Sequence, residues 1–143
     1  MKILSVDLGD VRTGLACCDR SEMLASPIGV IEEKNEKRLL EKVSSAAKEH
    51  GAEEIVVGYP KNMNNTIGPR AEKAELFAEK LRELARVPVM LWDERGTTVS
   101  AIGYLNETDT RGKKRKAIVD AVAAVIILES YLAYRRNKVE SLE

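Results

Sequence analysis

Histidine and cysteine are scarce in this chain, and their scarcity argues against several kinds of site. The 143 residues include one histidine, His50, and two adjacent cysteines, Cys17 and Cys18. Structural zinc sites use four histidine or cysteine ligands in spaced pairs, so the sequence does not support one. Adjacent strand residues point to opposite faces, so we expect two reduced thiols rather than a disulfide. His50 precedes Gly51 at an expected helix end, and we interpret it as a cap or surface residue.

The chain also lacks a charge excess and a long apolar segment. Its 23 basic residues match its 23 acidic residues, so a nucleic-acid interface has to come from a local cluster. The apolar stretch 117–128 contains Asp120 and is shorter than the roughly 20 residues that span a bilayer. A strand pattern begins at the second residue, which predicts no signal peptide. We therefore expect a cytoplasmic protein with no membrane partner.

No repeat, low-complexity tract or linker divides the sequence, and we expect one domain over residues 1–143. Hydrophobic residues make up 44% and charged residues 32%, a balance typical of globular proteins. The expected elements are strands at 2–7, 12–18 and 26–31, a helix at 35–49, a strand at 54–58, a helix from 69, a strand at 87–92, a short helix ending near 105 and a long helix at 116–135. This order predicts an α/β fold whose sheet is covered on both faces.

Three short apolar runs each contain an acidic residue. Asp7 ends the first run, Asp93 and Glu94 end the second, and Asp120 interrupts the third. A lone buried carboxylate is costly, or its pKa rises until it takes up a proton. Ligands of α/β sheets gather at the carboxyl ends of the strands, where Asp7 and the 93–94 pair are expected. A divalent metal ion is the simplest shared partner for converging carboxylates.

Each acidic residue also has a purely structural interpretation. Asp7 precedes a glycine turn of a kind common in hairpins, and Asp120 could pair with Lys116 one helical turn earlier. Asp93 and Glu94 are adjacent, so at least one points away from any site. Glu94 has the longer reach, whereas Asp93 could orient a neighbour or cap a turn. The residues around Asp120 are apolar, and this favours a functional carboxylate over a solvent-facing ion pair.

Groups that could bind phosphate lie near these acids. Arg12 follows the first turn, where Gly9 allows a positive φ and a close approach to a ligand. A long polar loop leads into the helix that begins at residue 69. Its donors Asn65, Thr66 and Arg70, together with the helix N-terminus, favour an anion.

One dense basic cluster, residues 111–116, directly precedes the expected helix that carries Asp120. A charge run is usually a solvated surface. Its position beside the acidic site favours binding to a phosphate backbone, with Lys116 as the last basic residue. Arg95, after the second acidic pair, could hold a scissile phosphate or pair with an acid.

Together these motifs resemble the YqgF/RuvX family of RNase H-like nucleases. The shared residues run in order along nearly the whole chain: Asp7-x-Gly9-x-x-Arg12-x-Gly14, Ile55-Val56-Val57-Gly58-x-Pro60, Asn65-Thr66-x-Gly68, Asp93-Glu94-Arg95-x-Thr97-Thr98 and Lys116-x-x-x-Asp120-x-x-Ala123-Ala124. The resemblance implies an RNase H-like fold with a five-stranded mixed sheet whose first three strands form a meander. The chain departs from the usual family pattern at Asn64-Asn65, where Asp-Gly is common, and at Gly96, where Leu is common. Neither departure removes a proposed ligand.

The resemblance also implies an activity. The family is implicated in processing the 5′ end of the 16S ribosomal RNA precursor, and it was described earlier as a candidate Holliday junction resolvase. It implies Asp7, Glu94 and Asp120 as ligands of Mg²⁺ or Mn²⁺. It implies contacts to the phosphate backbone from Arg12, Arg70, Arg95 and Lys116, to which the loop residues Asn65 and Thr66 add donors.

We therefore expect a metal-dependent nuclease that acts on structured RNA, with pre-16S rRNA as the favoured substrate. In a two-metal scheme Asp7 bridges ions about 3.5–4 Å apart, and Glu94 and Asp120 hold one each.

Three alternatives stay open. They are a resolvase acting on branched DNA, a non-catalytic RNA-binding ribosome-assembly factor, and an actin-like ATPase, which needs two lobes where this chain has room for one. A resolvase would be a two-fold dimer. The sequence shows no clear apolar stripe for such an interface, so we expect a monomer or a weak homodimer.

Overall fold

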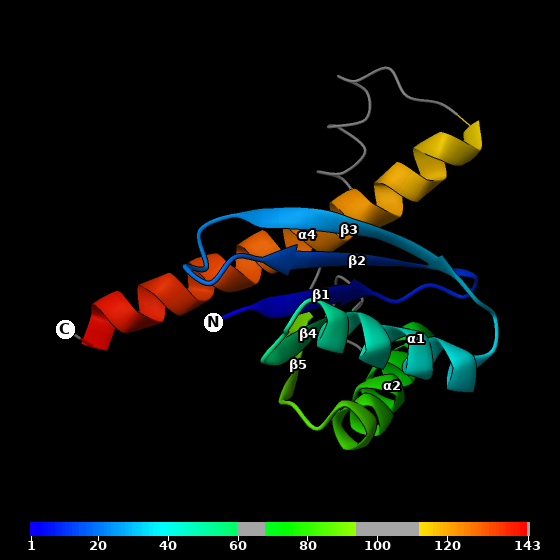
Figure 1. Cartoon of the computed structure of the whole chain (residues 1–143), viewed down its shortest axis with the longest axis horizontal. Helices are drawn as coiled ribbons and strands as arrows, with labels where there is room; N and C mark the ends of the chain where they lie inside the picture. The colour runs from blue at the N-terminus through cyan, green and yellow to red at the C-terminus, as the bar shows by residue number, and fades with distance from the viewer. Residues whose placement is uncertain (60–67, 94–111, 143) are drawn as a thin grey trace.

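The computed structural model describes residues 1–59, 68–93 and 112–142, with side chains for 1–59, 68–93 and 121–137 (Figure 1). Its elements are β1 (Ile3–Asp7), β2 (Arg12–Cys18), β3 (Ala25–Glu32), α1 (Glu36–Glu49), β4 (Glu54–Tyr59), α2 (Pro69–Ala85), β5 (Val89–Asp93) and α4 (Gly112–Leu142). The strands form one sheet in the order β3-β2-β1-β4-β5. The first three pair antiparallel as a meander, and β4 and β5 add in parallel to β1. The predicted mixed sheet is therefore confirmed.

Helices cover the two faces of the sheet, as Figure 1 shows, with α4 crossing one face and α1 and α2 lying on the other. Strand alternation explains the two cores that result. Leu4 and Val6 of β1 pack with α1 and α2, whereas Ile3 packs with Ile127 and Leu128 of α4. The two faces are called here the α1/α2 face and the α4 face. The two cysteines follow the same alternation, and both are free thiols, as predicted.

Local signals fix both ends of α1. The Asn35 side chain accepts a hydrogen bond from the Arg38 amide, which satisfies one orphan donor at the start of the helix. At the other end, Gly51 has φ +67°, and the amides of Gly51 and Ala52 donate back into the last turn. This left-handed termination explains why a glycine follows His50, the predicted cap.

The bounds of α4 and the start of β5 differ most from the sequence prediction. Helix α4 begins earlier, at Gly112, and ends later, at Leu142. Its basic first turns contain lysine and arginine, which are good helix formers, so the charge run continues the helix instead of acting as a loop. Strand β5 starts at Val89, after Pro88, rather than at residue 87. The short helix predicted to end near residue 105 lies outside the described residues.

Among the helices that the described ranges contain, none combines the length and apolar character needed to cross a membrane.

Candidate active site

Asp7 ends β1 at the edge of the sheet where β4 and β5 also end. It pairs with Gly14 of β2 and is half-buried. Side chains alternate between the two faces along a strand, and Ile3 and Ser5 of β1 both face α4. Asp7 has the same parity, meaning that it lies an even number of residues from them, so it belongs to the α4 face. The predicted position of this carboxylate at a strand end is confirmed.

One buried hydrogen bond aligns α4 with β1. The Ser5 hydroxyl, which is fully buried, donates to the carbonyl oxygen of Ala124 at 2.7 Å. Asp7 lies two residues further along β1, about 7 Å away. Asp120 lies one helical turn before Ala124, about 6 Å away. In Figure 1 the N-terminal part of α4 lies on the side of the sheet where β1 ends. The backbone positions of Asp7 and Asp120 are therefore both displaced from the Ser5–Ala124 contact toward that end of the sheet.

Strand register separates Asp93 from Asp7. Val89 and Leu91 of β5 pack on the α1/α2 face, whereas Trp92 packs with α4. Asp93 pairs with Tyr59 and shares the parity of Leu91, so it belongs to the face opposite Asp7. The structure therefore does not place Asp93 and Asp7 in one cluster.

The turn after Asp7 requires a glycine for a steric reason. A Cβ atom at Gly9 would lie 2.0 Å from the carbonyl oxygen of Arg12. The suggestion that Gly9 supplies a positive φ is wrong, because the positive-φ glycines among the described residues are Gly29 and Gly51. The Gly9 amide donates to the Thr13 hydroxyl at 3.4 Å, which closes the turn.

Arg70 lies beside this turn, together with Lys73, which the sequence analysis did not single out. A small hollow there is lined by residues of the turn, the end of β4 and the first turns of α2, including Gly58 and Arg70. Lys73 Nζ lies 3.0 Å from Asp10 Oδ1. The hydrogen bond from Lys73, followed by the charges of Lys73 and Arg70, lowers the pKa of Asp10. Lys73 was missed, although its position one helical turn after Arg70 could have indicated it.

Arg12 lies at the start of β2, next to the other side of the turn. Its Nε atom lies 3.6 Å from Glu32 Oε1 on β3, and the Glu32 carboxylate is largely exposed. Exposed ion pairs of this kind contribute little to stability, so a phosphate can replace Glu32 as the partner of Arg12 at small cost.

Several predicted site residues lie outside the description. Glu94, Arg95, Asn65 and Thr66 fall in the ranges that are not described, as do the side chains of Lys116 and Asp120 on α4. Within the part of the chain that is described, no three histidine, cysteine, aspartate or glutamate residues gather closely enough to hold a metal ion. The ligand set therefore stays a prediction.

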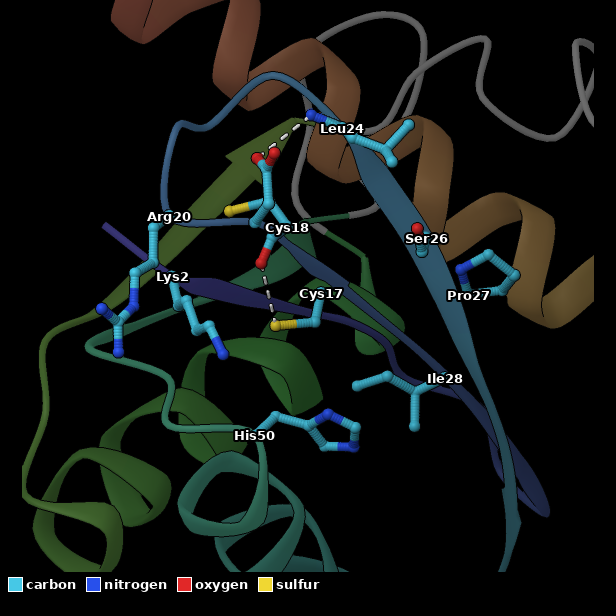
Figure 2. Close-up of a pocket in the computed structure, with 10 residues that line it drawn as sticks. Lys2, Cys17, Cys18, Arg20, Leu24, Ser26, Pro27, Ile28 and His50 are labelled. Carbon is cyan, nitrogen blue, oxygen red and sulfur yellow. Dashed lines mark hydrogen bonds between the residues drawn. The ribbon is translucent and has the colours of Figure 1, made fainter.

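A hollow of about 700 Å³ lies at the other end of the strands, where β1 begins and β2 ends (Figure 2). It is lined by residues that include Lys2, Cys17, Arg20 and His50. Burial raises the pKa of the Cys17 thiol, so the thiol stays protonated near neutral pH. The hollow is remote from Asp7, because Lys2 and Cys17 lie at the start of β1 and the end of β2.

Comparison with known proteins identifies the group to which the chain is related. Residues 1–134 match a family model described as RuvX, Holliday junction resolvase. A protein of Caldanaerobacter subterraneus named "Putative pre-16S rRNA nuclease" is 44% identical over 96% of this chain and 99% of its own. A Bacillus cytotoxicus protein of the same name is 43% identical over 92% of this chain and 98% of its own.

A solved structure shares the fold. RuvC of Thermus thermophilus aligns with a TM-score of 0.59 at 15% identity, covering 96% of this chain and 97% of its own. This likeness, together with the sheet order and helix layers described above, confirms the predicted RNase H-like fold. The family match and the two sequence relatives extend over nearly the whole chain, and the chain therefore belongs to the RuvX family.

Proposed function

We propose that residues 1–143 form one nuclease domain that hydrolyses phosphodiester bonds near the 5′ end of pre-16S rRNA with the help of divalent metal ions. One structural observation carries the proposal. The Ser5–Ala124 hydrogen bond aligns α4 with β1, and from this contact the backbone positions of Asp7 and Asp120 both lie toward the end of the sheet where β1 ends. The names of the sequence relatives and the family match support the reaction class and the substrate.

Asp7, Glu94 and Asp120 would hold two Mg²⁺ or Mn²⁺ ions between them.

 Carboxylate oxygens are the ligands that these hard cations prefer, so the donor set fits the ion. The ions would activate a water molecule and stabilise the leaving oxygen. The face of Asp93 argues against Asp93 as a ligand beside Asp7, and we propose Glu94 for that role instead.

The basic groups around the turn after Asp7 would hold the substrate backbone. Arg70 and Lys73 lie on one side of this turn, and Arg12 lies on the other. Guanidinium groups bind phosphate oxygens in a bidentate manner, so these residues would orient the scissile phosphate toward the carboxylates. We propose the same role for Arg95 and Lys116, and we propose that Asn65 and Thr66 donate hydrogen bonds to the backbone.

A cleavage assay with matched variants tests the proposal. Wild type is incubated with a 5′-leader fragment of pre-16S rRNA and, separately, with a four-way DNA junction, in Mg²⁺ or Mn²⁺. We expect the RNA to be cut by wild type and to stay intact with Asp7→Asn, Glu94→Gln or Asp120→Asn. Asp93→Asn is the matched control, because it removes a neighbouring carboxylate from the opposite face, and it should keep the wild-type rate.

The other outcomes separate the alternatives. Cleavage of the junction but not of the RNA would favour a resolvase, the activity in the description of the family model. RNA binding by wild type without cleavage in either metal would favour a ribosome-assembly factor. Full activity of a metal-loaded Asp7→Asn protein, or inactivity of Asp93→Asn with normal activity of Glu94→Gln, would refute the ligand set.

A further inference from the structure

Aromatic side chains gather where β5 meets α4. The chain has one tryptophan, four tyrosines and one phenylalanine. The tryptophan, Trp92, and two of the tyrosines, Tyr131 and Tyr134, are in contact. The Trp92 ring centroid lies 5.4 Å from that of Tyr131 and 5.1 Å from that of Tyr134.

Hydrogen bonds hold the inner rings of this cluster in place. The Trp92 indole Nε1 donates to the Ser130 hydroxyl at 3.0 Å. The buried Tyr131 hydroxyl donates to Glu54 at 2.8 Å. Because both polar atoms are satisfied within the protein, the rings are fixed before any ligand arrives, and a ligand would meet a preorganised surface.

The outer part of the cluster is open to solvent. Tyr134 is 46% exposed, and Met90, which shares the parity of Trp92 on β5, is 45% exposed. Two half-exposed side chains offer far less surface than the roughly 800 Å² that each partner buries in a standard protein interface. Their size suits one or two planar rings instead.

The position of the cluster indicates which planar group it would accept. Trp92 immediately precedes the Asp93-Glu94 pair at the end of β5. Its ring packs on the α4 face, to which Asp7 also belongs. A nucleic-acid strand held at the carboxylate edge would therefore pass near these rings. Unpaired bases stack on aromatic side chains, whereas the bases of a duplex are already stacked on each other.

We propose that Trp92 and Tyr134 form a stacking platform for an unpaired base of the RNA substrate, next to the cleavage site. This inference rests on the proposed function, since it assigns the substrate a single-stranded segment beside the scissile bond.

Trp92 itself reports on the platform, because it is the only tryptophan in the chain. Its fluorescence is recorded in EDTA, where a metal-dependent enzyme does not cut, during titration with a short single-stranded RNA and with a duplex RNA of the same sequence. We expect the single strand to quench Trp92 emission and the duplex to quench it much less.

Substitutions at Tyr134 separate stacking from general apolar contact. Tyr134→Leu keeps an apolar side chain but removes the ring, and it should weaken binding of the single strand about five- to tenfold. Tyr134→Phe keeps the ring and should bind as wild type does. Leu76→Ala is the control, because Leu76 is an exposed apolar residue on α2; it should leave binding unchanged. Circular dichroism checks that each variant folds.

Three outcomes would overturn the platform. They are the absence of quenching by the single strand, equal quenching by the duplex, and equal affinity of Tyr134→Leu and wild type. Emission that changes with protein concentration without RNA would also overturn it, since it would show a second copy covering the rings. Quenching in Asp7→Asn supports the platform independently of cleavage. If wild type fails to cleave but still shows ring-dependent quenching, the proposed function fails and the platform stands.

Discussion

At the scale of single residues, Gly9 shows how a backbone contact can dictate side-chain identity beside the site. The Arg12 carbonyl oxygen occupies the space that any Cβ atom at position 9 would need. Relief of this clash requires a shift of the turn that connects Asp7 to β2. The same turn carries Asp10, whose carboxylate binds Lys73 on α2. A substitution at Gly9 would therefore disturb the anchoring of the turn on both sides.

We predict that Gly9→Ala lowers the free energy of unfolding by about 1–3 kcal/mol, because the added methyl group overpacks the turn. Urea unfolding followed by circular dichroism measures the effect. Asp10→Ala is the matched control in the same turn: it removes an exposed ion pair without adding atoms, and it should change stability much less than Gly9→Ala does. Equal stability of Gly9→Ala and wild type would show that the turn relaxes freely.

Tyr131 provides a residue-level prediction about pH. Burial, followed by its hydrogen bond to Glu54, raises the pKa of Tyr131 to about 12. The hydroxyl of an unfolded tyrosine has a pKa of about 10, so the native state holds this proton more tightly. The stabilisation is therefore complete below about pH 10 and is lost as the pH rises through about 12.

Tyr131→Phe should accordingly be less stable than wild type at neutral pH, by about 1.5–3 kcal/mol, because a buried hydrogen bond to a charged group is lost. The difference should shrink between about pH 10 and 12. Urea unfolding at several pH values measures it. Tyr134→Phe is the control: it leaves the hydrogen bond between Tyr131 and Glu54 in place, and it should follow the wild-type pH dependence. A constant difference across this pH range would contradict the assignment.

Some residue-level predictions could be made from the sequence, and others could not. The position of Asp7 at a strand end was predictable, because an apolar run followed by an acid and a glycine marks such an end. The partner of Arg12 was not, because Glu32 lies on another strand and only the β2–β3 register brings them together. The same holds for Lys73 and Asp10, which meet through the packing of α2.

At the scale of elements, the contact between β1 and α4 matters most for the site. These two elements are far apart in the sequence, and each carries one proposed ligand. The Ser5–Ala124 hydrogen bond lies between them and is fully buried on the Ser5 side. Because the bond is short and directional, it constrains the position of α4 along β1.

We predict that Ser5→Ala lowers both stability, by about 1 kcal/mol, and the cleavage rate, since α4 can then shift relative to β1. Ser44→Ala is the matched control: Ser44 is a buried serine on α1, on the other face of the sheet. It should affect stability without a comparable loss of rate once both proteins are fully folded. Urea unfolding and the RNA cleavage assay measure the two effects. An equal rate for Ser5→Ala and wild type would contradict the role of this contact.

Element boundaries were predictable where a local signal marks them. Asn35, Gly51 and Pro69 each mark a helix end through side-chain capping, a positive φ or a fixed φ, and all three predictions are confirmed. The start of α4 was predicted too late, because a basic run indicates solvent exposure without deciding between helix and loop. Whether the basic run is helical depends on the packed turns of α4 that follow it, because the run extends that helix toward its N-terminus.

At the scale of the whole molecule, the fold was predictable from the order of its elements. Short connections between the first three strands favoured an antiparallel meander, and the helices between the later strands are long enough to serve as the crossovers that parallel strands need. The proposed site is harder to predict, because its acidic residues are far apart in the sequence: Asp7 ends β1, Asp120 lies on α4, and Glu94 follows β5. The face of an acid on a strand depends on its position in the strand alternation, which places Asp93 on the opposite face from Asp7.

Metal binding should be visible in the stability of the whole protein. An ion that binds only the native state stabilises it by mass action, by about 2.7 kcal/mol when its free concentration is 100 times its dissociation constant. We therefore predict that Mg²⁺ or Mn²⁺ raises the melting temperature of wild type in a concentration-dependent manner. Asp7→Asn should lose this increase, because the ion loses a charged ligand. Asp93→Asn should retain it, since Asp93 belongs to the opposite face. Differential scanning calorimetry without nucleic acid measures the increase, so the result does not depend on the choice of substrate. An equal increase in wild type and Asp7→Asn would place the ion elsewhere and remove Asp7 from the ligand set.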